Sequence, residues 1–254
     1  MTLVDVSQSA LFAGFIIFCR VGTASMFIPA IGDATTTTQV RLVFALLITF
    51  LLVPVKQHYI GPVPNDALAI IMLALQEVLV GVVLGMTMKI ILSSLHVLGM
   101  IIAFNSGLSS GMIFDPSQGT QGSPFGNFLT MFATVMILAT DLHLTMISGL
   151  ANSYDKFAID LFTTQYDDYF SAVVRTTSDA FNIGIKMAMP FIIVGLVFYL
   201  GIGILSRLMP QFQIFFLMLP AQILVNILIL MLTASAIISW FIGYYEEAVE
   251  SFLR

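Results

Sequence analysis

The sequence predicts an all-α membrane protein with about six long apolar helices, and three observations support this fold class. First, 59% of the 254 residues are hydrophobic and only 9% are charged, whereas about a quarter of the residues in a soluble domain are charged. Second, the apolar residues form runs that mostly reach the roughly 20 residues needed to cross a bilayer. Third, no polar linker divides the chain, so residues 1–254 are interpreted as a single membrane-embedded domain.

The predicted helices follow from the apolar runs taken in order. The run 40–55 is short, so it fits a bilayer only with little tilt, or it pairs with its predecessor as a helical hairpin through a turn at residues 33–39. The last run is long enough to predict a tilt, a break or an extension beyond the bilayer. The six predicted segments are 10–31, 40–55, 67–92, 128–151, 180–205 and 214–245.

Two of the connections have distinctive compositions. Residues 105–126 are rich in Gly, Ser and Gln, which favour irregular backbone over helix. Residues 152–179 carry five aspartates against Lys156 and Arg175, which indicates a solvated and partly helical connection. The N-terminal residues 1–9 contain only Asp5 as a charge, so the first apolar run is expected to stay in the mature protein.

Charge and cysteine content exclude several classes of partner. The formal net charge is −5 and no basic cluster is present, so nucleic acid is not an expected partner. Cys19 is the only cysteine, which rules out an internal disulfide and a thiolate metal site. The sequence also lacks a phosphate-binding loop, a metal-binding His pair and a nucleophile elbow. We therefore expect no enzyme activity, no cofactor and no metal.

Charges inside the apolar runs are the candidate functional residues, because each is costly in lipid unless it is paired or hydrated. Lys89 and Lys186 lie near segment ends and can extend to the interface. Arg20, Glu77 and Asp141 lie deeper, and two interpretations are open for them. They form structural ion pairs or helix contacts, or they form a proton or ion relay together with His143.

Glu77, Gly81, Gly85 and Lys89 recur every fourth residue and so form a stripe along one helix face. The two glycines would allow another backbone to approach closely. The partner helix is either in the same chain or in another subunit.

The most specific motif starts at Arg207 and continues through Pro210, Gln211 and Phe215. It resembles the R-x-x-P-Q-x-N-x-F signature of the FliR family of flagellar export proteins and of related type III secretion subunits. Gln213 stands where that family usually has Asn. Further similarity involves Arg20, Glu77, Gly81, Gly85 and the Asp115-Pro116 dipeptide, so the resemblance extends over the whole chain in the same order.

The resemblance implies a non-enzymatic subunit of the bacterial flagellar type III protein export gate, in the inner membrane at the flagellar basal body. The implied partners are the P and Q subunits of the gate, FlhB, exported flagellar proteins in transit and membrane lipid. Arg20, Glu77, Gly81, Gly85, Arg207, Pro210, Gln211 and Phe215 are then expected to make structural or subunit contacts. The alternative function is a small secondary transporter or ion channel that uses the intramembrane charges as a relay.

The glycine-rich connection resembles the corresponding loop of the FliR family, and this similarity favours a plug across the closed channel over an ordinary surface loop. Irregular backbone at membrane depth is tolerated only inside protein or beside a watery cavity, a condition that a loop in a pore meets. The residues assigned to the plug are Gly107, Gly111, Met112, Ile113, Phe114, Asp115 and Pro116.

Overall fold

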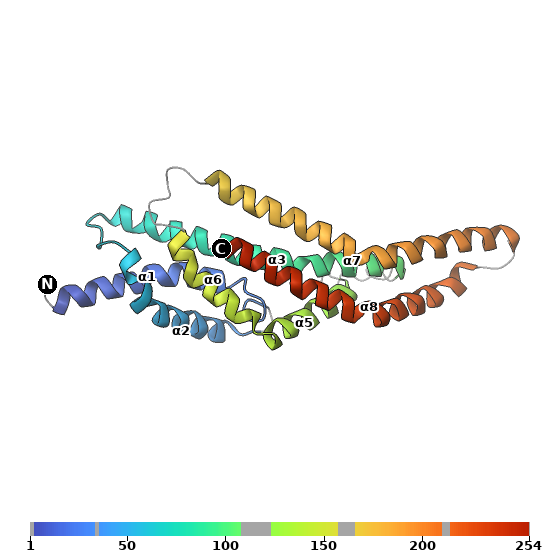
Figure 1. Cartoon of the computed structure of the whole chain (residues 1–254), viewed down its shortest axis with the longest axis horizontal. Helices are drawn as coiled ribbons and strands as arrows, with labels where there is room; N and C mark the ends of the chain where they lie inside the picture. Colours follow the sequence, from blue (N-terminus) through green and yellow to red (C-terminus); the bar gives the residue numbers. More distant parts are fainter. Residues whose placement is uncertain (1–2, 34–35, 108–122, 157–165, 210–213, 254) are drawn as a thin grey trace. The chain divides into compact units, whose positions relative to one another are not determined.

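The computed structural model describes residues 3–33, 36–107, 123–156, 166–209 and 214–253, and all of its regular structure within these ranges is helical. Seven α-helices and one 3-10 turn are assigned there, in chain order (Figure 1). They are α1 (Leu3–Ser25), α2 (Thr38–Lys56), η1 (Gln57–Tyr59), α3 (Ala67–Asn105), α5 (Pro124–Ala139), α6 (Leu142–Lys156), α7 (Tyr166–Leu208) and α8 (Ile214–Leu253).

Among the described residues, four helical stretches are long and apolar enough to cross a membrane, and a fifth is the bent pair α5 and α6. The four are Thr38–Tyr59, Ala67–Asn105, Ser171–Leu208 and Met218–Glu250. A shorter apolar helix, Ser9–Ser25, is the sixth apolar segment, so the fold is the all-α membrane fold that the sequence predicts, with about six apolar segments. The last segment is one assigned helix of 40 residues, with Pro220 inside it.

Several predicted boundaries differ from the structure. The helix α1 begins and ends before the predicted run 10–31, and α7 begins before the predicted run 180–205, inside the predicted connection 152–179. The run 128–151 is not one helix, because the chain breaks at Thr140 and Asp141 between α5 and α6. Asp141 has a φ of 59°, a left-handed conformation that cannot continue a right-handed helix. In addition, α3 continues to Asn105, past the predicted end at residue 92, and residues 124–126 already belong to α5.

The described chain groups into two compact units. Unit 1 comprises Met1–Ile91, Ile137–Thr177 and Glu246–Arg254, and unit 2 comprises Leu92–Met136 and Ser178–Tyr245. The boundaries fall within α3, α5 and α8 and inside α7. This explains why no linker in the sequence marks the division.

Unit 1 contains the hairpin of α1 and α2. A Cβ added at Gly14 of α1 would lie 3.6 Å from Cγ2 of Val53 near the end of α2, so the two helices run antiparallel. The turn is held by Arg41, whose Nε donates to the carbonyl of Ile31 at 3.2 Å and whose Nη2 donates to that of Asp33 at 3.1 Å. The predicted hairpin is thus present, and one guanidinium closes it.

Unit 2 is built on close helix crossings at glycines. A Cβ on Gly99 of α3 would collide with the backbone of Gly126 in α5, and the hydroxyl of Ser123 donates to the carbonyl of Gly99 at 2.7 Å. On α7, a Cβ at Gly184 would lie 2.8 Å from the carbonyl oxygen of Ser94. Small residues therefore set the helix spacing here, as expected for helices packed in an apolar environment.

Candidate functional site

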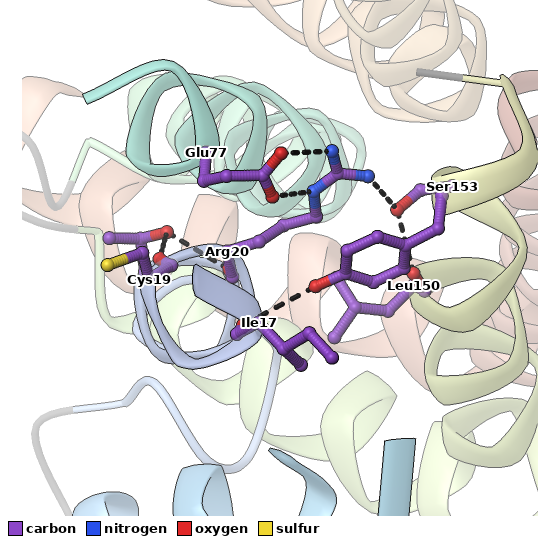
Figure 2. A network of polar contacts seen from close by, with 8 residues as sticks. Ile17, Cys19, Arg20, Glu77, Leu150 and Ser153 are labelled. Atoms are coloured by element: carbon purple, nitrogen blue, oxygen red, sulfur yellow. Dashed lines mark hydrogen bonds and ion pairs between the residues drawn. The ribbon is translucent and has the colours of Figure 1, made fainter. Parts of the chain in front are cut away.

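Arg20 and Glu77 form the centre of the candidate site, inside unit 1. Arg20 on α1 is 1% exposed and Glu77 on α3 is fully buried. Nε of Arg20 donates to Oε2 of Glu77 at 2.6 Å, and Nη2 donates to Oε1 at 2.8 Å. Figure 2 shows the guanidinium facing the carboxylate side by side, the arrangement in which an Arg–carboxylate pair makes two parallel hydrogen bonds.

The opposite edge of the same guanidinium reaches α6. Nη1 of Arg20 donates to the hydroxyl of Ser153 at 3.1 Å, and that hydroxyl donates to the carbonyl of Leu150 at 2.7 Å (Figure 2). Cζ of Arg20 lies 4.0 Å from the ring centroid of Tyr154. We call Arg20, Glu77, Ser153 and Tyr154 the Arg20 cluster. It connects α1, α3 and α6 through one side chain.

Burial makes this cluster sensitive to the loss of either partner. A charge removed from water needs both an opposite charge and hydrogen bonds to its remaining polar atoms. Here Nε, Nη1 and Nη2 of Arg20 all have acceptors, and both oxygens of Glu77 are bonded. This geometry is typical of a structural ion pair, because the polar atoms of Arg20 and Glu77 are directed at each other and at Ser153.

The rest of the predicted stripe on α3 lies against α1 and the residues that follow it. A Cβ at Gly81 would overlap Oγ1 of Thr23 and the carbonyl oxygen of Arg20. At Gly85 it would lie 2.7 Å from the carbonyl oxygen of Ala24. The close backbone approach at these glycines is therefore made within this chain, one of the two possibilities that the sequence left open.

Lys89 ends the stripe at the residues after α1. Its Nζ lies 5.9 Å from the ring centroid of Phe27 while the residue itself is exposed. The contacts advance from Arg20 to Phe27 on one side and from Glu77 to Lys89 on the other, so α1 and α3 run parallel. We call the contact of Glu77, Gly81, Gly85 and Lys89 with this part of the chain the α1–α3 seam.

A second ion pair in unit 1 was not anticipated from the sequence. Nζ of Lys56, at the end of α2, donates to both carboxylate oxygens of Asp155 near the end of α6, at 2.9 and 3.0 Å. The same Nζ lies 5.0 Å from the ring centroid of Tyr59. Lys56 and Asp155 are 99 residues apart, and the sequence places both in polar connections where no periodic pattern can match them.

Of the predicted residues of the Arg207 motif, only some lie among the residues that the structure describes. Arg207 is exposed in the last turn of α7. Pro210 and Gln211 lie outside the described residues, as does the side chain of Phe215, whose backbone belongs to α8.

The predicted plug is likewise mostly beyond the described ranges. Gly107 has a φ of 71°, and a Cβ there would lie 2.7 Å from Cδ2 of Leu219 on α8. Gly111, Met112, Ile113, Phe114, Asp115 and Pro116 lie outside the described residues. The plug assignment stays a prediction.

The two remaining relay candidates lie at the break between α5 and α6. Asp141 is exposed, and its carbonyl accepts from the amide of Leu144 in the first turn of α6 at 2.9 Å. Nδ1 of His143 is buried and has no hydrogen-bond partner among the described residues. Within the same residues, no group of three or more His, Cys, Asp or Glu side chains is placed to hold a metal ion.

Comparison with known proteins places this arrangement in a family. Residues 11–248 match the model of the bacterial export proteins, family 1. The flagellar biosynthetic protein FliR of Caulobacter vibrioides is 32% identical, over 93% of this chain and 94% of its own length. FliR of Aquifex aeolicus is 26% identical over 97% and 94%, and FliR of Escherichia coli K12 is 28% identical over 78% and 75%. The chain therefore belongs to the bacterial export proteins, family 1, as a FliR-type component of the flagellar export apparatus.

Proposed function

We propose that this chain is a non-enzymatic subunit of the flagellar type III export gate, which helps to form and seal the channel for unfolded flagellar proteins. It acts in the inner membrane at the flagellar basal body. Its partners are the P and Q subunits of the gate and FlhB, and flagellar proteins contact it in transit. Family membership supports the export role. The buried ion pair of Arg20 and Glu77 supports a structural role for the charged residues within that function.

The observation that carries the proposal is the Arg20 cluster. A relay group must be able to gain or lose a proton, or exchange an ion, during each cycle. Nε and Nη2 of Arg20 are both bonded to the carboxylate of Glu77, and both residues are buried. This favours a structural role for the pair over a role as a transport site, because the pair stabilises the protein most when both partners remain bonded.

Exposed apolar helix faces are the second support. On α7 and α8 many large hydrophobic side chains are more than half exposed, including Leu196, Leu200, Leu228 and Met231. Such faces require lipid or other subunits to cover them. A gate assembled from several membrane subunits would supply that cover.

Isolation of the complex tests the proposal. An affinity-tagged chain, expressed in a flagellated bacterium that lacks its own copy, is extracted in mild detergent and its bound proteins are identified by mass spectrometry. Co-purification of P and Q, with restored secretion of the filament protein, is the expected result. A homo-oligomer that transports ions or solutes after reconstitution, without P or Q, would instead support the transporter.

A further inference from the structure

The last turn of α6 is bonded to α1 at two consecutive residues. The hydroxyl of Ser153 accepts one hydrogen bond from Nη1 of Arg20 at 3.1 Å. The hydroxyl of Tyr154 donates to the carbonyl of Ile17 at 3.4 Å, and its ring lies against the guanidinium of Arg20. Ser153 is 1% exposed and Tyr154 is 2% exposed. These contacts place the turn directly on the Arg20 cluster.

The next residue, Asp155, is bonded on the other side of α6. Successive side chains of an α-helix point about 100° apart, so those of Ser153 and Asp155 leave α6 on nearly opposite sides. Both carboxylate oxygens of Asp155 accept from Nζ of Lys56, in the last turn of α2. One turn of α6 is therefore bonded to α1 on one side and to α2 on the other.

The hydrogen bonds on the α1 side hold this turn only weakly. Arg20 gives one bond to the neutral oxygen of Ser153 but two bonds to the carboxylate of Glu77. Glu77 therefore fixes the guanidinium without help from α6. The bond from Tyr154 to Ile17, at 3.4 Å, is longer than the roughly 2.5–3.0 Å of a well-formed O–H···O bond. The turn needs a further contact to stay in place.

The ion pair on the α2 side supplies that contact. The side chain of Lys56 is 10% exposed and that of Asp155 is 43% exposed. An ammonium that has lost most of its water needs an acceptor of opposite charge, and Asp155 bonds it twice, at 2.9 and 3.0 Å. Such a pair is less weakened by water and salt than a fully exposed one. The position of the turn therefore depends on Lys56, a residue outside the Arg20 cluster.

We propose that Lys56 and Asp155 are positioning residues for the Arg20 cluster. They fix the last turn of α6 from the α2 side, so that the hydroxyl of Ser153 and the ring of Tyr154 stay on the guanidinium of Arg20. An ion pair near the surface thereby keeps the buried hydrogen-bond network complete. This role does not depend on the gate function, because all of its contacts lie within one unit of this chain.

Hydrogen–deuterium exchange, measured on peptides by mass spectrometry, tests the role of Lys56. The full-length chain is isolated with its bound proteins in mild detergent. Lys56→Met removes the ammonium but keeps an unbranched apolar side chain, so the packing of the lysine stem is largely preserved. Lys56→Arg keeps a cation at the same place. Lys186→Met, at an exposed lysine of α7, is the matched control for the loss of one positive charge.

The exchange rate of residues 150–156 gives the outcome. Lys56→Met should raise it by about tenfold, since loss of a charged hydrogen-bonded contact lets the turn open more often. Lys56→Arg and Lys186→Met should exchange at the wild-type rate. An unchanged rate in Lys56→Met would mean that the Arg20 cluster holds the turn by itself, and a uniform rise over all helices would mean a general loss of stability. Either of these two results overturns the proposal.

A double-mutant cycle measures the coupling between the two sides of the turn. Thermal unfolding in detergent is followed for Lys56→Met, for Ser153→Ala and for the double variant. If both contacts hold one turn, the first loss already frees it, so the double variant should lose less in Tm than the two single variants lose together. A double variant whose loss equals the sum of the single losses would show that the contacts act independently, and the positioning role would then be wrong.

Discussion

Nε and Nη2 of Arg20, on α1, donate to the two carboxylate oxygens of Glu77, on α3, at 2.6 and 2.8 Å. Because both side chains are buried, the pair stabilises the fold only when both partners are present. Removal of one partner leaves a buried charge, whereas replacement of both can be nearly neutral. This asymmetry gives the first prediction.

Glu77→Ala should destabilise the chain by about 3–5 kcal/mol, the cost of leaving a buried charge without its counter-charge. Glu77→Gln should cost less, because its amide oxygen still accepts one hydrogen bond from Arg20. The double variant Arg20→Met with Glu77→Leu should recover much of the loss. The fraction of chain that stays folded in detergent across a temperature series measures all three. An Ala variant as stable as the Gln variant would contradict a structural pair.

Gly81→Ala should destabilise the α1–α3 seam, because the added methyl group would meet the backbone carbonyl of Arg20 and the hydroxyl of Thr23. Gly243→Ala is the matched control on α8, since no atom lies within 4 Å of a Cβ at that position. There the better helix propensity of alanine should stabilise by about 0.5–1 kcal/mol. Thermal unfolding in detergent measures both variants. A gain in stability at Gly81 as well as at Gly243 would show that the seam tolerates a wider spacing.

Arg41→Met should loosen the turn between α1 and α2. The guanidinium donates to the carbonyls of Ile31 and Asp33, and each such hydrogen bond from a charged group contributes about 1.5–3 kcal/mol when well formed. Since Arg41 is only half-buried, we expect a total loss near the lower value. Faster protease cleavage between residues 26 and 40 is the expected observation. Cleavage at the wild-type rate would mean that the turn holds without it.

Arg207→Leu should reduce assembly and secretion of flagellar proteins more than Arg175→Leu does. Both arginines are exposed on α7, so the loss of one surface charge is common to the two variants. Only Arg207 begins the sequence motif that resembles the FliR signature. Secreted filament protein in the culture medium and co-purified P and Q are the measurements. Equal secretion from the two strains would remove the reason for singling out this motif.

Shortening the segment 107–122 should let small ions or solutes leak through the membrane while the complex still assembles. The expectation comes from the glycine-rich sequence and its resemblance to the FliR loop. Dye or ion flux in cells that express the shortened chain tests it, and co-purification of P and Q checks assembly. Unchanged permeability of an assembled complex would show that this loop is not the seal.

The sequence predicts most of the helices, because long apolar runs are a strong signal, but it does not predict where one run divides. The apolar segment 128–151 contains no Pro, and other polar residues such as Thr134 and Thr145 lie on either side of the break at Thr140 and Asp141, so composition does not mark it. The sequence also fails to predict the end of α3, here because polar residues suggest a helix end where the structure has none. Ser93, Ser94 and His96 suggest an exit from the apolar run, yet Ser94 is fully buried and the helix continues to Asn105.

The candidate site was predictable as a set of residues but not as a set of contacts. The four-residue spacing from Glu77 to Lys89 identifies one helix face, and α1 lies on that face. Spacing cannot indicate that Ser153 and Tyr154 complete the environment of Arg20, because they are more than 130 residues further along the chain. The same limit applies to Lys56 and Asp155.

The distance in sequence between Arg20 and Glu77 has a consequence for biosynthesis. Arg20 leaves the ribosome 57 residues before its counter-charge. Until α3 has been made, α1 is an apolar helix with an uncompensated cation near its C-terminal end. We therefore expect α1 to reach its final position in the membrane only after α3 has been made. Until then the hairpin of α1 and α2 should remain bound to the insertion machinery. A nascent chain truncated before Glu77 should remain extractable from the membrane at high pH, and one truncated after α3 should not.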